Sequence, residues 1–582
     1  MRAFHLGIFA LATLLWASCG KDEIRTVDPG SGGGGSDIAD TIIVDDDDYD
    51  RTVVIVFSTT GDATVTGTGD SVTATVSGND VTVTNTSQKK VMYRLSGTTT
   101  DGYLKIYSGR KQGITLNSVN ITNTRGAAIN VQGLAATPNK GKRVDLVLEG
   151  SSRLADGATY SLTPEGEDEK ATFFSEGQIA VSGSGELTVN ATGKAGMTSD
   201  DWVQIAAGTL NITSSAGHGV RGKDYIVVTG GTVNVSVSAG GKKGFSSDSL
   251  VRFDGGVTTM TITGNTVVTT ENGVSDTNGT AGVKADQIFE MNSGTLTITN
   301  SGTGGKGISC DGPAYFRDGI VDITVTGSNF GSSSSGGGPG GGPGGGGGWP
   351  PGGGSSDNSV GAKGIKVDGN LEISGGVITV KASSHEGIET KGTLLISGGE
   401  IYSQSSDDAI NSASDMTITG GVVCAYSTGN DGLDANGNCY IQGGTIYAIG
   451  KTTPEMAIDA NTEGGKKLYI QGGTIIAIGS LENGAQLTQS CYQASSWTKN
   501  KWYAMTIGNE TIAFKTPSSG GNGLVVSGAS QPTLKQGVTV SDGTIIFGGN
   551  GYADATVTGG TSVSLSEYSG QGGGGPGPGP RW

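Results

Sequence analysis

The chain has 582 residues, and 106 of them are glycine. It carries 54 acidic and 37 basic side chains, and this net charge of −17 argues against nucleic acid as a partner. No strict Gly-X-Y period appears, so a collagen-like chain is excluded. Thr, Ser, Val and Ile fill much of the remainder, which is typical of a turn-rich, all-β protein.

The first 18 residues have the pattern of a signal peptide. Arg2 precedes an apolar stretch over residues 4–16 that is too short to span a bilayer. The sequence LWASC, which ends at Cys19, resembles the lipobox of bacterial lipoproteins, and GKDE at residues 20–23 resembles the surface-export signal of Bacteroidetes lipoproteins. The resemblance implies an outer membrane lipoprotein that is exposed at the cell surface and touches the membrane only through a lipid on Cys19. The alternative is a secreted protein without this lipid.

Two segments follow before any regular repeat. Residues 19–51 contain SGGGGS and a run of four aspartates, which predicts a flexible acidic tether. Residues 52–150 alternate apolar and polar side chains without a fixed period. This pattern predicts irregular N-terminal strands that also form a cap.

A Gly-Gly pair recurs through the middle of the chain. It occurs in LEISGGVITV, LLISGGEIYS, MTITGGVVCA, YIQGGTIYA and LYIQGGTIIA, and its second glycine recurs at steps of 23, 22, 23 and 29 residues from Gly376 to Gly473. Short alternating apolar runs surround each pair, and no helical period is present. A strand-built period of this length predicts a parallel β solenoid over residues 151–485, in which stacked coils bury a continuous core.

Other patterns interrupt and end this repeat. Residues 331–356 are rich in Gly, Pro and Ser and cannot bury a core, so we expect a disordered insert. Residues 486–568 alternate again without the Gly-Gly pair, which predicts a C-terminal β cap over the end of the stack. Residues 569–582 are expected to be a disordered tail.

Coils of similar length place equivalent residues in columns, about 4.8 Å apart. We align the coils on a small residue followed by an inward aliphatic residue, as in Gly387-Ile388. Two acidic columns then flank the inward residue on one face. The first column contains Glu386, Asp408 and Asp431, and the second contains Glu389, Asn411, Asp434 and Asp459.

Carboxylates at this spacing repel each other strongly unless they are protonated or bridged by a cation. Clustered carboxylates with an amide oxygen are hard ligands, which suit Ca²⁺ better than zinc, and no Cys/His cluster competes with them. The sequence therefore predicts bound Ca²⁺ on this face. The alternative is a solvated acidic surface.

The same columns turn basic one coil earlier. Lys363 precedes Glu386 in the first column, Lys366 precedes Glu389 in the second, and Lys306 lies one step before Lys363. Ion pairs between coils are the simpler interpretation. The alternative is a lyase in which Lys363 or Lys366 abstracts a proton from a calcium-bound uronate. Neighbouring acids would raise the pKa of such a lysine, which argues against catalysis.

Aromatic side chains define a second candidate surface. Tyr402 and Tyr447 follow Gly-Gly pairs at outward positions, and Tyr440 and Tyr469 share an outward column before such pairs. Aromatic rings on a flat face offer a platform for sugar rings. The alternative is that these tyrosines are ordinary surface residues of a sheet.

Four cysteines follow the predicted signal peptide and lipobox, and none has metal-site spacing. Cys424 and Cys439 could meet across adjacent coils, but the pattern does not settle their disulfide state. The disulfide state of Cys310 and Cys491 is left open as well.

Several segments resemble one known family. The stretch that begins ATFFSEGQIAVSGSGELTV and continues through GHGVRGKD, together with VDLVLEGSSRLADG, DDAINSASDMTITGG and NDGLDANGNCYIQGG, resembles the bacterial carbohydrate-binding β-helix family first described in cellulose-degrading clostridia. The likeness covers residues 100–480. It implies a right-handed parallel β-helix similar to pectate lyases, with calcium and plant-type or acidic pectic polysaccharides as ligands and no established catalysis. Within the matching segment, the further candidate calcium ligands are Asp200, Asp201, Asp224 and Asp248.

Together these patterns predict a monomeric cell-surface lipoprotein that binds a polysaccharide with the help of Ca²⁺. The fold class expected is all-β, a right-handed parallel β-helix with N- and C-terminal β caps. Two other functions remain open. One is a polysaccharide lyase that acts on uronate glycans, and the other is a structural adhesin whose columns only hold the solenoid together.

Overall fold

A computed structural model describes residues 48–69, 71–134, 142–161, 163–271, 274–331 and 360–570 of the protein. The predicted lipid site at Cys19, most of the expected tether and insert, and most of the expected tail lie outside these residues. Within the described residues we find no helix that is long and apolar enough to cross a membrane.

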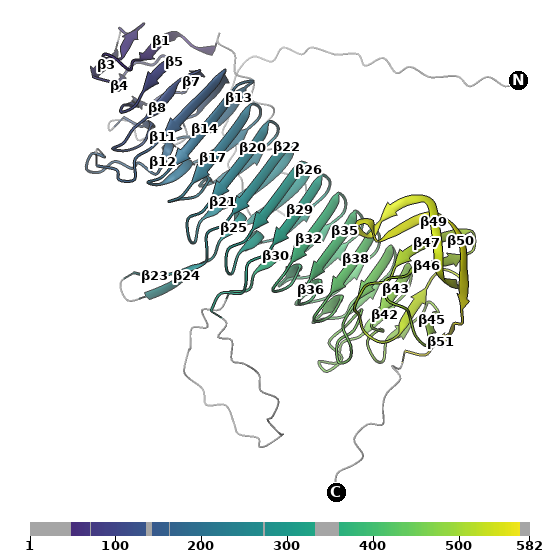
Figure 1. Cartoon of the computed structure of the whole chain (residues 1–582). Helices are drawn as coiled ribbons and strands as arrows, with labels where there is room; N and C mark the ends of the chain where they lie inside the picture. The colour runs from purple at the N-terminus through teal and green to yellow at the C-terminus, as the bar shows by residue number, and fades with distance from the viewer. Residues whose placement is uncertain are drawn as a thin grey trace, which may run out of the picture. The chain divides into compact units, whose positions relative to one another are not determined.

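Most of the described strands belong to three ladders, in which a strand pairs in parallel with the equivalent strand of the next repeat (Figure 1). Ladder 1 is a sheet of 14 strands, parallel except for the pair β3–β4. Its strands are β3 (Val72–Ser77), β4 (Asp80–Asn85), β6 (Tyr103–Ser108), β9 (Ile129–Gln132), β12 (Ala171–Ser175), β15 (Ala195–Ser199), β18 (Val220–Gly222), β21 (Lys243–Ser247), β25 (Ala281–Ala285), β27 (Lys306–Cys310), β30 (Lys363–Val367), β33 (Ile388–Thr390), β36 (Ile410–Ser412) and β39 (Leu433–Ala435).

Ladders 2 and 3 belong to one 31-stranded sheet because the long strands β22 and β26 run through both. Ladder 2 contains β1 (Arg51–Phe57), β5 (Val91–Thr99), β7 (Gln112–Asn117), β10 (Val144–Glu149), β13 (Ile179–Gly183), β16 (Trp202–Ile205), β19 (Tyr225–Val228), β22 (Leu250–Ile262), β26 (Ile288–Asn300), β28 (Ala314–Phe316), β31 (Leu371–Ile373), β34 (Leu394–Ile396), β37 (Met416–Ile418), β40 (Cys439–Ile441), β42 (Leu468–Ile470) and β44 (Gln486–Leu487). Ladder 3 adds β8 (Asn120–Thr122), β11 (Ser151–Ala155), β14 (Glu186–Ala191), β17 (Thr209–Ser214), β20 (Thr232–Val237), β29 (Ile320–Val325), β32 (Val377–Ala382), β35 (Glu400–Ser405), β38 (Val422–Ser427), β41 (Thr445–Ile449) and β43 (Thr474–Ile478).

Antiparallel strands complete the described fold. The short strands β2 (Thr64–Thr66), β45 (Cys491–Ala494), β48 (Leu524–Ser527) and β51 (Ser566–Tyr568) pair at the two ends of the 31-stranded sheet, and β23 (Val267–Glu271) and β24 (Val274–Asn278) form a separate hairpin. A closed barrel consists of β46 (Trp502–Ile507), β47 (Glu510–Lys515), β49 (Thr533–Ile546) and β50 (Gly551–Val563), with the short 3₁₀ helix η2 (Phe547–Gly549) between the last two.

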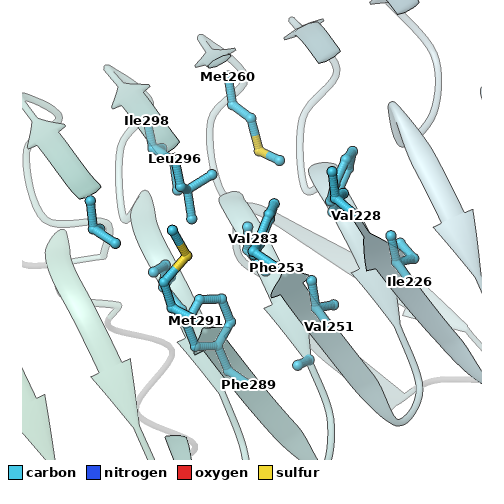
Figure 2. Close-up of a cluster of buried hydrophobic side chains, with 14 of the residues drawn as sticks. Ile226, Val228, Val251, Phe253, Met260, Val283, Phe289, Met291, Leu296 and Ile298 are labelled. Atoms are coloured by element: carbon cyan, nitrogen blue, oxygen red, sulfur yellow. The ribbon is translucent and has the colours of Figure 1, made fainter. Parts of the chain in front are cut away.

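The inward residues of the repeats form one apolar core between the ladders. The aliphatic or aromatic residue expected to point inward on ladder 1 is fully buried in every repeat from Met197 to Ile458. Figure 2 shows how side chains from β19, β22, β25 and β26, including Phe253, Phe289 and Met291, meet in this interior. A continuous core of this kind exists only because the repeats stack, since a single repeat has no second layer to cover its apolar side.

The Gly-Gly pairs make the turns before the strands of ladder 3. Gly421, the second glycine of one pair, has a φ of 85°, which disfavours residues with a side chain. A Cβ atom there would lie 2.8 Å from the carbonyl oxygen of Gly398 in the preceding repeat. The pair therefore repeats because the backbone of one turn lies directly on the backbone of the next.

The predicted fold class needs correction. The described chain is all-β, but a right-handed parallel β-helix with β caps is wrong as its description, because residues 502–563 close into a barrel of antiparallel strands. The physical reason lies in the pattern of this region. Its strands alternate without the Gly-Gly pair, and alternation alone does not show which strands pair or whether a sheet closes on itself.

Candidate functional site

The two predicted acidic columns lie side by side on ladder 1. Lys366, Glu389, Asn411 and Asp434 occupy equivalent positions of β30, β33, β36 and β39. Ile458 bridges to Leu433, so Asp459 continues this column beyond Asp434. In the other column, Glu386, Asp408 and Asp431 follow one another from repeat to repeat. The backbone amide of Gly387 donates to the carbonyl of Asp408 at 3.1 Å, and the backbone amide of Ala409 donates to the carbonyl of Asp431 at 3.0 Å. The structure therefore brings both columns together on one face.

Lysines neutralise the upstream end of these columns. The Nζ atom of Lys363 lies 3.2 Å from a carboxylate oxygen of Glu386 and 2.5 Å from one of Glu389. Lys391 also pairs with Glu389. Burial by itself would raise the pKa of Glu389, but Lys363 and Lys391 more than offset this effect and lower it. Both glutamates are therefore ion-paired and are weaker candidates for a cation site.

Lysine positions also bear on the predicted lyase. Lys363 is held between two glutamates, and Lys366 donates to Asp368 at 2.6 Å rather than to Glu389. Neither side chain is free to face a substrate proton. The predicted ion pairs between repeats therefore form at Lys363. Lys366 instead pairs with Asp368, which follows it on the same repeat.

At the downstream end of the columns, the described residues provide no ion pairs of this kind to neutralise the carboxylates. One carboxylate oxygen from each of Asp431, Asp434 and Asp459 lies within 4.8 Å of the other two. Asp431 is only 8% exposed, and Asp408 is similarly buried beside it. In the described part of the chain, no lysine, arginine or histidine comes within 4.0 Å of these four carboxylates. Asp434 and Asp459 are partly exposed. The four therefore form a largely buried acidic cluster and not a solvated acidic surface.

Burial and mutual repulsion hold protons on this cluster. Burial raises the pKa of Asp431 from 3.8 to about 7. Burial, with the charge of Asp434 next, raises that of Asp408 to about 8, and burial also raises the pKa of Asp434 to about 6. Burial and a hydrogen bond to Glu482 raise the pKa of Asp459 to about 10. Each of these carboxyl groups is thus costly to ionise unless a cation binds.

Hydrogen bonds fix the shape of the cluster. The side-chain amide of Asn411 donates to Asp408 at 3.2 Å and to Asp434 at 2.5 Å. The backbone amide of Asp431 donates to Asp408 at 3.1 Å, and that of Met456 donates to Asp431. Asn411 therefore acts toward these acids as a hydrogen-bond donor that ties the two columns together.

Sequence reasoning missed two parts of this face. Glu482 follows Leu481 and extends the second column by one more repeat, since Ile458 bridges to Leu481. The signal was present, because Ser480-Leu481 repeats the small-then-aliphatic pair. His385, Glu386 and Asp407 form a second group whose ligand atoms lie within 4.8 Å of one another, and hydrogen bonds to Asp407 and Glu386 raise the pKa of His385 to about 9. A lone histidine in the sequence does not reveal this neighbourhood.

The other candidate calcium ligands are dispersed. Asp200 accepts two hydrogen bonds from Lys170, at 2.7 and 2.8 Å, and Asp248 accepts two from Arg221, at 2.8 and 2.9 Å. Asp201 and Asp224 do interact, because burial and the charge of Asp224 raise the pKa of Asp201 to about 6. In this segment, the structure thus brings together one pair of acids and engages the other two in ion pairs.

The four candidate tyrosines divide into two groups. Tyr440 and Tyr469 are neighbours in ladder 2 and stack with ring centroids 4.9 Å apart and an interplanar angle of 10°. Both remain partly exposed. This pair is available as a flat aromatic platform.

The prediction that Tyr402 and Tyr447 form an exposed platform is wrong. Tyr447 is completely buried, and Tyr402 is 8% exposed. Both point outward from ladder 3, but the barrel covers them: Phe514 and Phe547 pack on Tyr447 with ring centroids 5.5 and 5.3 Å away. Because this contact joins segments more than 60 residues apart, strand periodicity did not reveal it.

The four cysteines within the described residues are buried and unpaired. Cys439 lies in the main core, whereas Cys424 lies in the second core between ladder 3 and the barrel. The two side chains point to opposite sides of the sheet, so the disulfide considered from the sequence does not form.

The fold and the site define an all-β, repeat-built protein with a largely buried acidic cluster and a separate, partly exposed aromatic pair. Comparisons with known proteins add a family. The model of the family described as carbohydrate-binding domain-containing protein matches residues 77–432 and 352–495, more than half of the chain. The chain therefore belongs to this family.

Two relatives illustrate how far the likeness extends. A carbohydrate-binding domain-containing protein of Acetivibrio thermocellus is 28% identical over 127 residues, which cover 21% of this chain and 43% of that protein. The chain thus matches less than half of that relative's length. A solved structure of a polysaccharide lyase-like protein from C. thermocellum, a gadolinium derivative, is 22% identical and covers 47% of this chain and 100% of the other, with a TM-score of 0.38. This TM-score is too low to establish a common fold.

Proposed function

We propose that this protein binds an acidic polysaccharide through Ca²⁺ held by the buried acidic cluster of Asp408, Asp431, Asp434 and Asp459. The observation that carries the proposal is the convergence of three carboxylates within 4.8 Å of one another, without a basic partner among the described residues. Membership of a carbohydrate-binding family supports the class of ligand.

The donor set fits Ca²⁺ on chemical grounds. Calcium takes six to eight oxygen ligands and tolerates irregular geometry, and carboxylates are its usual protein ligands. No cysteine lies in the cluster, which disfavours softer metals. When bound, Ca²⁺ supplies positive charge that neutralises these acids and can also attract the carboxylates of a uronate sugar. A chain with a net charge of −17 would otherwise repel such a ligand.

Tyr440 and Tyr469 support a second contact with neutral sugar rings. Their parallel rings lie on ladder 2, whereas the acidic cluster lies on ladder 1. The two surfaces therefore do not form one pocket. A polysaccharide, unlike a single sugar, is long enough to use both.

Titration calorimetry of the full chain with polygalacturonate tests the proposal. We expect binding in 1 mM Ca²⁺, at least about tenfold weaker binding in excess EDTA, and the same loss in a D431N/D434N variant that retains Ca²⁺ in the buffer. The D322N variant is the matched control, since Asp322 is exposed on β29 of ladder 3. Unchanged affinity in EDTA would show that calcium does not bridge the ligand.

We also propose that the protein is a surface-exposed outer membrane lipoprotein, attached through Cys19. Support comes only from the LWASC sequence and the GKDE that follows it. Labelling cells with an alkyne fatty acid should tag the wild-type chain and not a C19A variant. Equal labelling of the two would remove the lipid from the proposal.

A further inference from the structure

On ladder 1, the repeats just upstream of the acidic columns carry lysines on the same face, at β21, β25, β27 and β30. Lys243 begins β21 and Lys306 begins β27, in the column that continues through Lys363 to Glu386. Ala281 separates the two lysines, so they lie two repeats, about 9.6 Å, apart. In the second column, the repeats that carry these lysines have Ser246 and Ser309, with Lys284 between them. The second-column side chain is therefore small in both of these repeats.

Unlike the other lysines of this face, Lys243 and Lys306 lack a carboxylate partner. Lys284 pairs with Asp286 and Asp311, and Lys366 and Lys363 pair with acids as described above. Among the described residues, no acid lies within 4.0 Å of Lys243 or Lys306. Within the described chain, each Nζ atom donates one hydrogen bond, to the backbone carbonyl of Gly241 at 3.0 Å for Lys243 and of Gly304 at 3.5 Å for Lys306.

Both ammonium groups are partly buried, so water does not fully replace the missing partner. Burial, and then neighbouring lysines, lower the pKa of each to about 8. The charged neighbours include both basic and acidic groups. Around Lys243 they are Lys242, Lys284, Asp286 and Asp276, and around Lys306 they are Lys366, Lys363, Glu389 and Lys243.

We propose that Lys243 and Lys306 form a cation-independent subsite for the carboxylates of an acidic polysaccharide. The choice of a uronate glycan as ligand rests on the proposed function, whereas the anion subsite rests on the two unpartnered amines. An ammonium donates up to three hydrogen bonds, and each amine here makes only one within the described chain. A carboxylate supplies both the missing acceptor and the missing charge.

The position of the subsite also matches a linear ligand. Ladder 1 carries the unpartnered lysines at β21 and β27 and the acidic cluster at β36 and β39. An extended polyanion that runs along the ladder therefore meets amines first and calcium-dependent carboxylates further on. Each end uses a different chemistry for the same ligand group.

The test measures oligogalacturonate binding by the full chain at pH 7 in excess EDTA, which removes calcium-dependent binding. We expect residual binding to the wild type, about tenfold weaker binding to K243Q/K306Q, and no binding of a carboxyl-reduced, neutral oligomer. The control K381Q/K466Q removes two exposed lysines, one on β32 of ladder 3 and one in the loop before β42, and should leave the affinity unchanged. Thermal melts confirm that each variant is folded.

A second readout follows from protonation. Wild-type affinity in EDTA should fall between pH 7 and pH 9, as amines with a pKa of about 8 lose their protons. In K243R/K306R this fall should disappear, because guanidinium stays charged. Equal affinities of wild type and K243Q/K306Q, or no wild-type binding in EDTA, would overturn the subsite. Neither result would affect binding that requires calcium, so the two proposals fail separately.

Discussion

Replacing Asp431 by Asn tests two effects of this side chain separately: its effect on folding stability without metal, and its role as a calcium ligand. In the metal-free protein the pKa of Asp431 is raised from 3.8 to about 7. A carboxyl group with a raised pKa binds its proton more tightly in the folded state than in the unfolded state. Its effect on folding is therefore neutral well below pH 4 and increasingly destabilising as the pH rises from 4 through 7.

The size of the effect follows from the same two values. A rise from 3.8 to about 7 corresponds to about 4 kcal/mol between the protonated and ionised forms, and we take this as an upper limit. Asn keeps the acceptor oxygen that receives the amide of Met456, and it carries no charge. We therefore expect D431N to be more stable than the wild type in EDTA at pH 8, by up to about 4 kcal/mol, and nearly equal at pH 4.

Calcium should narrow this difference in stability. A ligand that binds only the folded state at 100 times its Kd adds about 2.7 kcal/mol of stability. The wild type should gain this stability in calcium, whereas D431N should gain much less because a ligand carboxylate is lost. Urea unfolding at pH 4 and pH 8, with EDTA or Ca²⁺, measures all four values, and D322N serves as the control.

Two outcomes would refute the reasoning. If D431N is less stable than the wild type in EDTA at pH 8, ionised Asp431 does not destabilise the fold. If calcium stabilises D431N as much as the wild type, Asp431 is not a ligand.

Three further predictions concern binding and packing. Calcium-dependent polygalacturonate binding should weaken from pH 8 to pH 5, because protons compete with Ca²⁺ for carboxyl groups such as Asp434, whose pKa is about 6; equal affinity at both values, measured by calorimetry, would contradict this. Replacing Tyr440 and Tyr469 by Ala should weaken glycan binding about tenfold or more without lowering Tm, since both rings are partly exposed. A glycan array measures the binding, and a thermal melt measures Tm. Tyr447→Ala should lower the free energy of unfolding by about 3–5 kcal/mol because it empties the second core, and an unchanged urea midpoint would argue against that contact.

The sequence predicts the repeats well, but it predicts the partners of their side chains less well. The inward residues from Met197 to Ile458 and the alignment of Glu389, Asn411 and Asp434 were read correctly, because the strands pair in register at a nearly constant period. That alignment follows from local spacing alone. Local spacing does not show which acids remain without a basic partner. Lys363, for example, reaches two glutamates of the next repeat through its long, flexible side chain.

The failed predictions share a different cause. Tyr402 and Tyr447 were expected to be exposed because their position in the strand is outward, and the barrel that covers them begins only at Trp502. The fold class failed for the same region, where alternating strands carry no information on closure. The unpartnered state of Lys243 and Lys306 is equally a property of the neighbours that the fold supplies.

The amino-acid sequence by itself determined the all-β character, the period of the repeats and the residues that share a column, because these depend on spacing along the chain. Only the tertiary structure decided which of those residues are buried, paired or open to a ligand. Burial and charge compensation depend on side chains brought together from distant parts of the chain, and no local pattern contains that information.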